Sequence, residues 1–278
     1  MKKVLVTGAG GYIGRHVVKA LLDSGNDVYA CDLFLNGVDQ RAKLIKQSIF
    51  SSDKDIFTTL GCPDICIHLA WRDGFVHNSA AHMEDLSGHY TFVKNMIDGG
   101  LKHISVLGSM HEVGYWEGAI NENTPTNPLS LYGIAKNSLR RSLEIMLANN
   151  TEVVFQWLRA YYILGDDLKN NSIFAKILVA AEEGKDVFPF TTGKSKFDFI
   201  TVYELAMQIA AASTQDNVTG VINCCKGNPV TLAQKVEEFI AEHTLNIKLG
   251  YGMYPDRPYD SPGIWGDSSK IDEILKGK

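Results

Sequence analysis

The stretch that decides the fold is Thr7-Gly8-Ala9-Gly10-Gly11-Tyr12-Ile13-Gly14, close to the amino terminus. It separates a predicted strand at 4–7 from a predicted helix at 14–24. Gly8 permits a tight turn, Gly11 lets the backbone approach a pyrophosphate, and Gly14 lets the helix pack closely on the sheet. The free N–H groups and partial positive charge at the helix start favour the same anion. The stretch therefore predicts a dinucleotide phosphate cradle, with Tyr12 and Ile13 among its contacts.

Asp32 ends the second predicted strand, at 28–31. A carboxylate in that place accepts hydrogen bonds from the adenosine ribose hydroxyls and repels a 2′-phosphate. NAD is therefore favoured over NADP. Arg15 and Arg41 keep NADP open, because a nearby guanidinium can accommodate the additional phosphate.

Working outward, short β-branched runs alternate with longer helical patterns, which is typical of parallel βαβ units. The pattern predicts an α/β fold, a Rossmann doubly wound parallel sheet with a smaller C-terminal substrate-binding region. We expect the NAD(P)-binding domain at 1–164, segments at about 194–225 that return to it, and a mainly substrate-binding region at 165–278. The tail, which holds Pro255, Pro258 and Pro262, is expected to lack regular elements. The expected strands are 4–7, 28–31, 65–69, 103–107, 152–158 and 194–200, and the expected helices are 14–24, 82–99, 131–149, 173–183, 202–212 and 232–243.

Tyr132 and Lys136 open the long helix predicted at 131–149, and their i, i+4 spacing places both side chains on one helical face. An ammonium beside a phenol favours phenolate and lowers a pKa that starts near 10. The tyrosine can then exchange a proton with a hydroxyl or carbonyl while hydride moves to or from a nicotinamide. Ser109 follows the strand at 103–107 and can donate a hydrogen bond to the same oxygen. These residues predict a proton-transfer site.

Composition narrows the class of protein. The 278 residues are 45% hydrophobic and 21% charged, and the net charge of -5 leaves no basic surplus for a nucleic-acid partner. The sequence contains no apolar run of the roughly 18 residues that a membrane-spanning helix needs. Five cysteines, mostly in strand-like runs, suit reduced, buried thiols in a cytoplasmic protein. Cys62 and Cys66 lack the second ligand pair of a structural zinc site, so no metal is expected.

Taken together, these motifs resemble those of the extended short-chain dehydrogenases/reductases of the NAD-dependent epimerase/dehydratase family. The resemblance runs almost end to end and rests above all on the glycine stretch and on the segment Asn127–Lys136 that carries the tyrosine and lysine. It implies Tyr132 as general acid/base, Lys136 as its activator and a ligand of the nicotinamide ribose, and Ser109 as carbonyl polariser. The further matching segments are 68–70, 158–159, 198–202, 223, 257–260 and 267–270.

The resemblance also implies ligand contacts and an assembly. Leu69 and Ala70 would contact the cofactor, Arg257 would bind the diphosphate of a nucleotide sugar, and Asp260 would contact its nucleoside. Trp71, His111 and Tyr162 are candidates for the sugar pocket, together with Arg72 and His77. Family members commonly form homodimers through the two helices that correspond here to 82–99 and 131–149.

Departures from the family pattern bear on the reaction. Dehydratases carry an Asp-Glu pair immediately after the position of Ser109, where this chain has Met110 and His111, with Glu112 one place too late. A 4,6-dehydratase is therefore disfavoured. Trp71 replaces a usual alanine, Phe197 a usual basic residue, and Tyr161-Tyr162 stand near a usual asparagine, which leaves the nucleotide sugar open.

Three functions remain. The first is a ketoreductase that delivers hydride to C4 of a keto-deoxy-sugar nucleotide, and the short chain favours it. The second is a nucleotide-sugar 4-epimerase, which needs the same residues and which Asp32 favours, because epimerases retain NAD. The third is a non-catalytic dinucleotide-sensing protein, and the intact tyrosine–lysine pair speaks against it.

Overall fold

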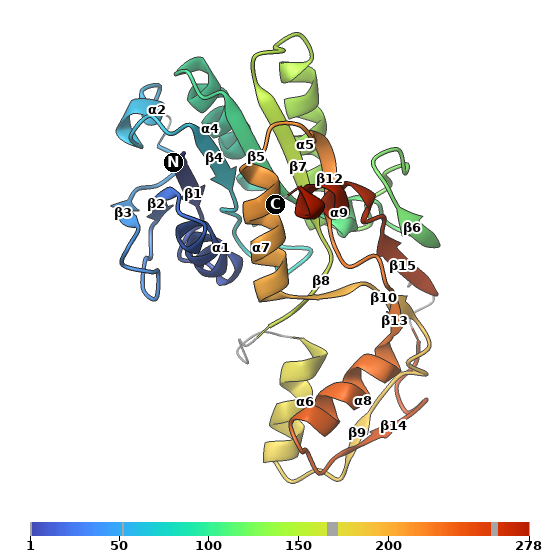
Figure 1. Ribbon diagram of the computed structural model, residues 1–278. Helices are drawn as coiled ribbons and strands as arrows, with labels where there is room; N and C mark the ends of the chain where they lie inside the picture. The colour runs from blue at the N-terminus through green and yellow to red at the C-terminus, as the bar shows by residue number, and fades with distance from the viewer. Residues whose placement is uncertain (1, 52, 166–171, 257–260, 278) are drawn as a thin grey trace.

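The computed structural model describes residues 2–51, 53–165, 172–256 and 261–277, and a seven-stranded parallel sheet forms its centre (Figure 1). The strand order is β12-β7-β5-β4-β1-β2-β3. The direction of winding reverses between β1 and β4, and in open α/β sheets ligands bind at such a switch point, outside the carboxyl ends of the strands. The strands are β1 (Lys3–Thr7), β2 (Asp27–Asp32), β3 (Lys43–Lys46), β4 (Ile65–His68), β5 (His103–Ser109), β7 (Val154–Ala160) and β12 (Gly220–Cys224).

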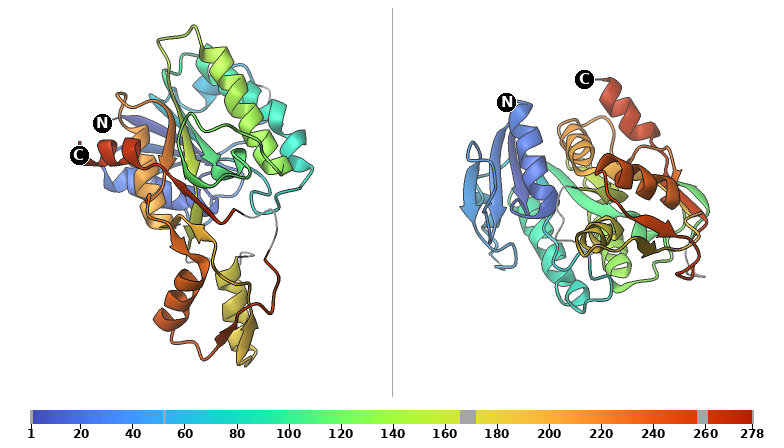
Figure 2. Two further views of the ribbon diagram at one scale, coloured as in Figure 1. Left: turned by 90° about the vertical axis from the view of Figure 1, so that its right-hand side faces the viewer. Right: turned by 90° about the horizontal axis from the view of Figure 1, so that it is seen from below.

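Helices cover both faces of this sheet (Figures 1 and 2). On one face α1 (Tyr12–Asp23), α7 (Val202–Ser213) and α9 (Ser269–Lys276) pack together, and on the other α2 (Ile56–Thr59), α4 (Leu86–Asp98) and α5 (Leu131–Leu147) do so. Successive strand side chains point to opposite faces. Val4 and Val6 therefore join the core beneath α1 and α7, whereas Leu5 joins the core beneath α4 and α5. The doubly wound architecture predicted from the sequence is confirmed.

A second lobe hangs below the sheet in Figure 1 and is well separated from it in the left view of Figure 2. It contains α6 (Ile173–Glu182), α8 (Leu232–Glu242), β9 (Val187–Pro189) and β14 (Lys248–Gly250), around its own core of Ile177, Phe190 and Val236. A four-stranded sheet runs from beside the main sheet toward the second lobe (Figure 1), in the order β13 (Val230–Thr231), β10 (Lys196–Phe197), β15 (Gly263–Gly266) and β6 (Gly118–Ile120). A separate pair is formed by β8 (Tyr162–Leu164) and β11 (Phe199–Thr201).

The structure corrects several sequence-based expectations. The end of the tail is regular, because β15 pairs with β6 and β10, and α9 packs on α7, whereas the described residues 251–256 and 261–262 belong to no helix or strand. The helix expected at 82–99 is split into α3 (Ala81–Glu84) and α4. The strand expected at 194–200 is interrupted at Asp198, whose buried carboxylate accepts backbone N–H bonds from residues 226, 227 and 266. Cys62 is exposed, while the other four free cysteines are buried. Among the described residues, every helix is too short or too polar to cross a membrane.

Candidate active site

The glycine turn is packed too tightly to accept side chains. Gly8 has a φ of +70°, which favours glycine, and an added Cβ would lie 2.5 Å from the backbone nitrogen of Ala70. An added Cβ at Gly14 would lie 2.0 Å from the carbonyl oxygen of Gly8. The turn after β1, the start of α1 and the Leu69–Ala70 segment after β4 therefore meet at the switch point of the sheet.

Asp32 supports this turn directly. One carboxylate oxygen accepts the N–H of Gly10 at 3.0 Å, and the other accepts the N–H of Leu33 at 2.6 Å. A Cβ on Gly10 would lie only 1.7 Å from the carbonyl oxygen of Phe34. The sequence analysis gave Gly10 no role, because the closeness of the loop after β2 is not visible in the local pattern. Asp32 thus orders the turn in addition to its predicted ribose contact.

The start of α1 fits a dinucleotide pyrophosphate. Gly11 is the N-cap residue, is exposed, and makes no side-chain capping hydrogen bond. The amino-terminal N–H groups of a helix are left without helical acceptors and attract anions. The residues at this edge therefore suit the phosphates of NAD, while the Asp32 carboxylate opposes a further phosphate on the ribose.

The three predicted proton-transfer residues come together at the ends of β5 and α5. Ser130 caps α5, with its hydroxyl accepting the N–H of Gly133 at 3.1 Å, and so places Tyr132 in the first turn. The side chain of Ser109, the last residue of β5, lies close enough to the phenol of Tyr132 to lower its pKa. Lys136 is buried and donates from Nζ to the carbonyl of Leu107 at 2.7 Å.

Burial dominates the electrostatics of this group. It raises the pKa of Tyr132 to about 12, and the nearby Ser109 hydroxyl offsets only part of that effect. Burial also lowers the pKa of Lys136 to about 7, against a smaller opposing influence from the negative charge of Glu112. The sequence predicted a lowered phenol pKa, so the structure differs: burial outweighs the lowering effect of Ser109, and Nζ of Lys136 lies 5.9 Å from the phenol ring centroid.

Aromatic side chains from the segment after β4 surround Tyr132. The ring of His77 stacks on the phenol at 5.5 Å between centroids and 11° between planes. His111 contacts His77 at 4.4 Å and Tyr132 at 6.1 Å. The carbonyl of His77 accepts the backbone N–H of Tyr132 at 2.9 Å, which ties this segment to the start of α5. His82 also lies 5.3 Å from Tyr132 between ring centroids, so three histidines lie beside the proton-transfer group.

The other candidate sugar ligands do not all lie beside Tyr132. Trp71 belongs to the same cluster, 6.1 Å from Tyr132 between ring centroids. Tyr162 packs in a different aromatic cluster, against Phe197 at 4.4 Å. Arg257 and Asp260 lie outside the described residues.

Glu112 is a buried residue beside the site to which the sequence assigned no role of its own. Its buried carboxylate accepts the backbone N–H of Ser109 at 2.6 Å and the indole N–H of Trp157 at 2.9 Å. It also pairs with Arg140 and Arg159, each at 3.5 Å. The Ser-x-x-Glu spacing of a capping box was the available signal. Glu112 faces the core and holds the end of β5, which gives a structural reason to reject the dehydratase alternative.

Comparisons with known proteins show which proteins this chain is similar to. A family model described as "NAD dependent epimerase/dehydratase family" matches residues 4–225. The chain is 44% identical over 271 residues to dTDP-6-deoxy-L-talose 4-dehydrogenase (NAD(+)) of Aggregatibacter actinomycetemcomitans, covering 95% of this chain and 98% of the relative. It is 26% identical to the UDP-glucose 4-epimerase of Neisseria meningitidis serogroup B, covering 97% and 90%.

Solved structures show the same fold. A UDP-glucose-4-epimerase from Stenotrophomonas maltophila, with bound NAD and formylated UDP-arabinopyranose, superposes with a TM-score of 0.87 at 17% identity, covering 99% of this chain and 93% of that chain. A UDP-glucose 4-epimerase from Thermotoga maritima, with UDP-glucose, gives a TM-score of 0.81 at 23% identity, covering 98% and 91%.

Proposed function

Because this chain belongs to the NAD-dependent epimerase/dehydratase family, we propose that it is an NAD-dependent oxidoreductase acting at C4 of a dTDP-linked 6-deoxysugar. The observation that carries the proposal is the meeting of Ser109, Tyr132 and Lys136 where β5 ends and α5 begins, with the serine hydroxyl beside the phenol and Nζ of the lysine 5.9 Å from the phenol ring centroid. The relative that shares 44% identity is a 4-dehydrogenase of this substrate class. The reverse of that reaction is the 4-ketoreduction expected from the sequence.

Within this proposal, bound NAD supplies the hydride acceptor. Tyr132 takes the proton of the C4 hydroxyl during oxidation and returns it to the C4 oxygen during reduction. Ser109 donates a hydrogen bond to that oxygen. Lys136, when charged, stabilises the phenolate, which is needed because burial holds the pKa of Tyr132 at about 12. Gly11 and the start of α1 hold the pyrophosphate, and Asp32 selects the unphosphorylated ribose.

The sugar pocket is proposed from the side chains around the phenol. His77 and His111 lie against Tyr132 and present ring nitrogens that can bond sugar hydroxyls. Arg257 and Asp260 would hold the diphosphate and nucleoside, and Tyr162 would lie on the substrate side. In this view residues 1–164, with the returning segments at about 194–225, bind the cofactor, while 165–278 mainly bind substrate.

Epimerisation is the second candidate, supported by the 4-epimerases among the relatives. The two reactions differ in whether NAD stays bound to the purified enzyme. The experiment is to denature the purified protein, identify any released cofactor, and assay dTDP-6-deoxysugars with added NAD. Turnover that requires added NAD and yields a 4-keto sugar supports the dehydrogenase. Stoichiometric tightly bound NAD with interconversion of C4 epimers, or failure to act on any such sugar, contradicts it.

The assembly is a homodimer in this proposal, formed through α4 and α5. Ile134 and Ile145 are both exposed on α5 and, eleven residues apart, lie on one face of the helix; together they support such a contact. Light scattering of the purified protein measures the mass: a monomer at micromolar concentration contradicts the dimer.

The five free cysteines favour a reducing, cytoplasmic location for the enzyme.

A further inference from the structure

The side chain that most closely faces the Lys136 ammonium is an indole. Nζ of Lys136 lies 3.7 Å from the ring centroid of Trp71, whereas it lies 5.9 Å from the ring centroid of Tyr132. A cation within about 6 Å of an indole face is attracted by the ring quadrupole, and tryptophan gives the strongest such contact. Lys136 is thus bound by a carbonyl oxygen of β5 and by the face of Trp71.

The indole is itself held in place on its edge and on its second face. Its N–H donates to Nδ1 of His82 at 3.1 Å, and Nε2 of His82 bonds to the carbonyl of Val76 at 3.0 Å. The ring of His89 stacks parallel to it, 4.4 Å away and inclined by 10°. The imidazole of His89 and the ammonium of Lys136 are both so close to the centre of the Trp71 ring that they would collide on the same face. They therefore occupy opposite faces of the indole.

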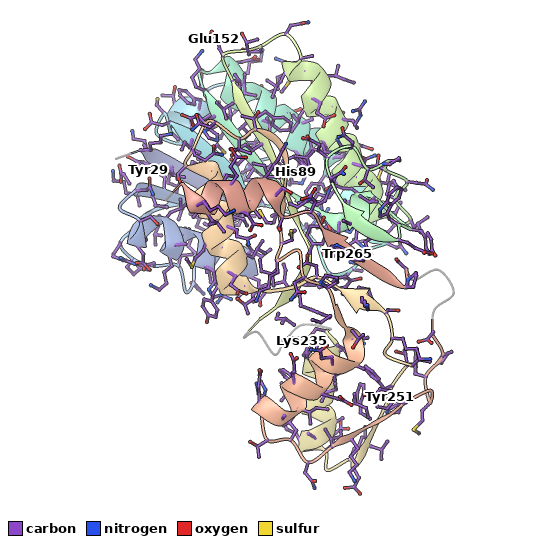
Figure 3. All side chains as sticks on the ribbon, turned by 45° about the vertical axis from the view of Figure 1, so that its right-hand side comes forward. Tyr29, His89, Glu152, Lys235, Tyr251 and Trp265 are labelled. Carbon is purple, nitrogen blue, oxygen red and sulfur yellow. The ribbon has the colours of Figure 1, made fainter. Side chains whose placement is uncertain are left out.

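A chain of hydrogen bonds connects His89, which stacks on the indole, with Thr7 at the end of β1. His89, labelled in Figure 3, bonds through Nδ1 to Nε2 of His68 at 3.0 Å, and Nδ1 of His68 bonds to the hydroxyl of Thr7 at 2.7 Å. Burial lowers the pKa of His68 to about 3 and that of His89 to about 2. Both rings are therefore neutral at physiological pH and do not repel the lysine, so a rigid, uncharged support lies behind Trp71.

We propose that Trp71 is the positioning residue of Lys136: its indole face holds the ammonium in place and favours the charged form, so that Trp71 acts on catalysis through the lysine. The inference rests on the proposed function, in which charged Lys136 stabilises the Tyr132 phenolate. It replaces the expectation that Trp71 lines the sugar pocket, since both ring faces are already occupied. The remaining groups around the lysine are the Glu112 carboxylate, which opposes loss of its charge, and the neutral phenol of Tyr132.

The first test uses the protein without substrate. In protein labelled with ¹³C at the lysine ε carbons, the Lys136 signal is identified by its absence from Lys136→Met. Its ε protons are expected well upfield of ordinary lysine, because they lie over the indole, and to return toward the ordinary position in Trp71→Leu. Trp116→Leu, at a tryptophan whose indole N–H bonds to Ala119, is expected to leave the signal unchanged. An ordinary position in the unaltered protein overturns the proposal, and that measurement does not depend on a variant that folds.

The second test compares Trp71→Phe with Trp71→Leu, which both keep apolar bulk but differ in having a ring face. The apparent pKa of Lys136 is expected to be lower in the leucine variant by about 0.4–1.5 units, the range that a cation–π contact supplies. The inflection of kcat against pH is expected to move with it, with the KM of the sugar nucleotide nearly unchanged. A raised KM with an unmoved pH profile would instead make Trp71 a sugar ligand and overturn the proposal. If the unaltered protein fails to oxidise any sugar nucleotide, the proposed function fails, while the lysine spectra still decide the contact.

Discussion

The carboxylate of Glu112 accepts the backbone N–H of Ser109 at 2.6 Å, so the last residue of β5 is anchored by an anion buried in the core. The same carboxylate forms ion pairs with two arginines, Arg140 from α5 and Arg159 from β7. One side chain therefore connects the strand that carries Ser109 with the helix that carries Tyr132. Glu112 is a positioning residue, and its removal is expected to disturb both elements together.

Glu112→Gln is expected to lower the free energy of unfolding by about 3–5 kcal/mol, because it leaves buried arginine charge uncompensated. Urea unfolding followed by circular dichroism measures this. Glu144→Gln is the matched control: that carboxylate also pairs with Arg140 but is partly exposed, and its loss should cost less than about 1 kcal/mol. Equal effects of the two substitutions would argue against the role of the buried anion.

Gly10→Ala is expected to destabilise the protein by about 1–3 kcal/mol and to weaken NAD binding, because the new methyl group meets the carbonyl oxygen of Phe34. Thermal unfolding and titration with NAD provide the two measurements. Gly74→Ala makes the same chemical change where nothing lies within 4 Å of the added carbon. That control should behave like the unaltered protein, and an equally benign Gly10→Ala would show that the turn is less closely packed than described.

Asp32→Asn is expected to shift the ratio of the NADP and NAD dissociation constants by about tenfold toward NADP, or ~1.4 kcal/mol. The amide oxygen can still accept the N–H of Gly10, so this contact with the turn is kept while the negative charge is lost. Asp27→Asn, at the other end of β2, serves as control. An unchanged ratio of dissociation constants in Asp32→Asn would remove the ribose contact from the proposal.

Tyr132→Phe is expected to lower kcat by about 10²–10⁴, the range that proton transfer by a positioned side chain contributes. NAD affinity should stay nearly constant, because only the hydroxyl is removed. Steady-state kinetics and NAD titration give both values. Tyr115→Phe removes an exposed hydroxyl that bonds to Glu117, and is expected to leave turnover intact; retained turnover in Tyr132→Phe would exclude its role as general acid/base.

Lys136 also predicts a pH dependence of stability. Its pKa falls from 10.5 to about 7 on burial. Between these values the unfolded chain binds a proton that the folded chain does not, so unfolding takes up a proton and becomes harder as the pH rises. Relative to Lys136→Met, the free energy of unfolding should therefore increase from pH 7 to 9, with a slope of up to about 1.4 kcal/mol per pH unit. A constant difference between the two proteins over that range would contradict the lowered pKa.

The sequence by itself determined the features that depend on neighbours along the chain. The glycine turn between β1 and α1, the alternation of strands with helices, and the i, i+4 pair Tyr132 and Lys136 are local patterns, and the structure contains each of them. Their meaning follows from backbone conformation and helical periodicity, which act over a few residues.

Tertiary structure alone decided which distant groups meet. Trp71 reaches Lys136, Gly10 meets the loop after β2, and β15 finds its place between β6 and β10, although their partners lie far away in sequence. Burial also turned the expected lowering of the Tyr132 pKa into a rise. These outcomes depend on packing and on the loss of water around a charge, and both arise only when the sheet and its helices have assembled.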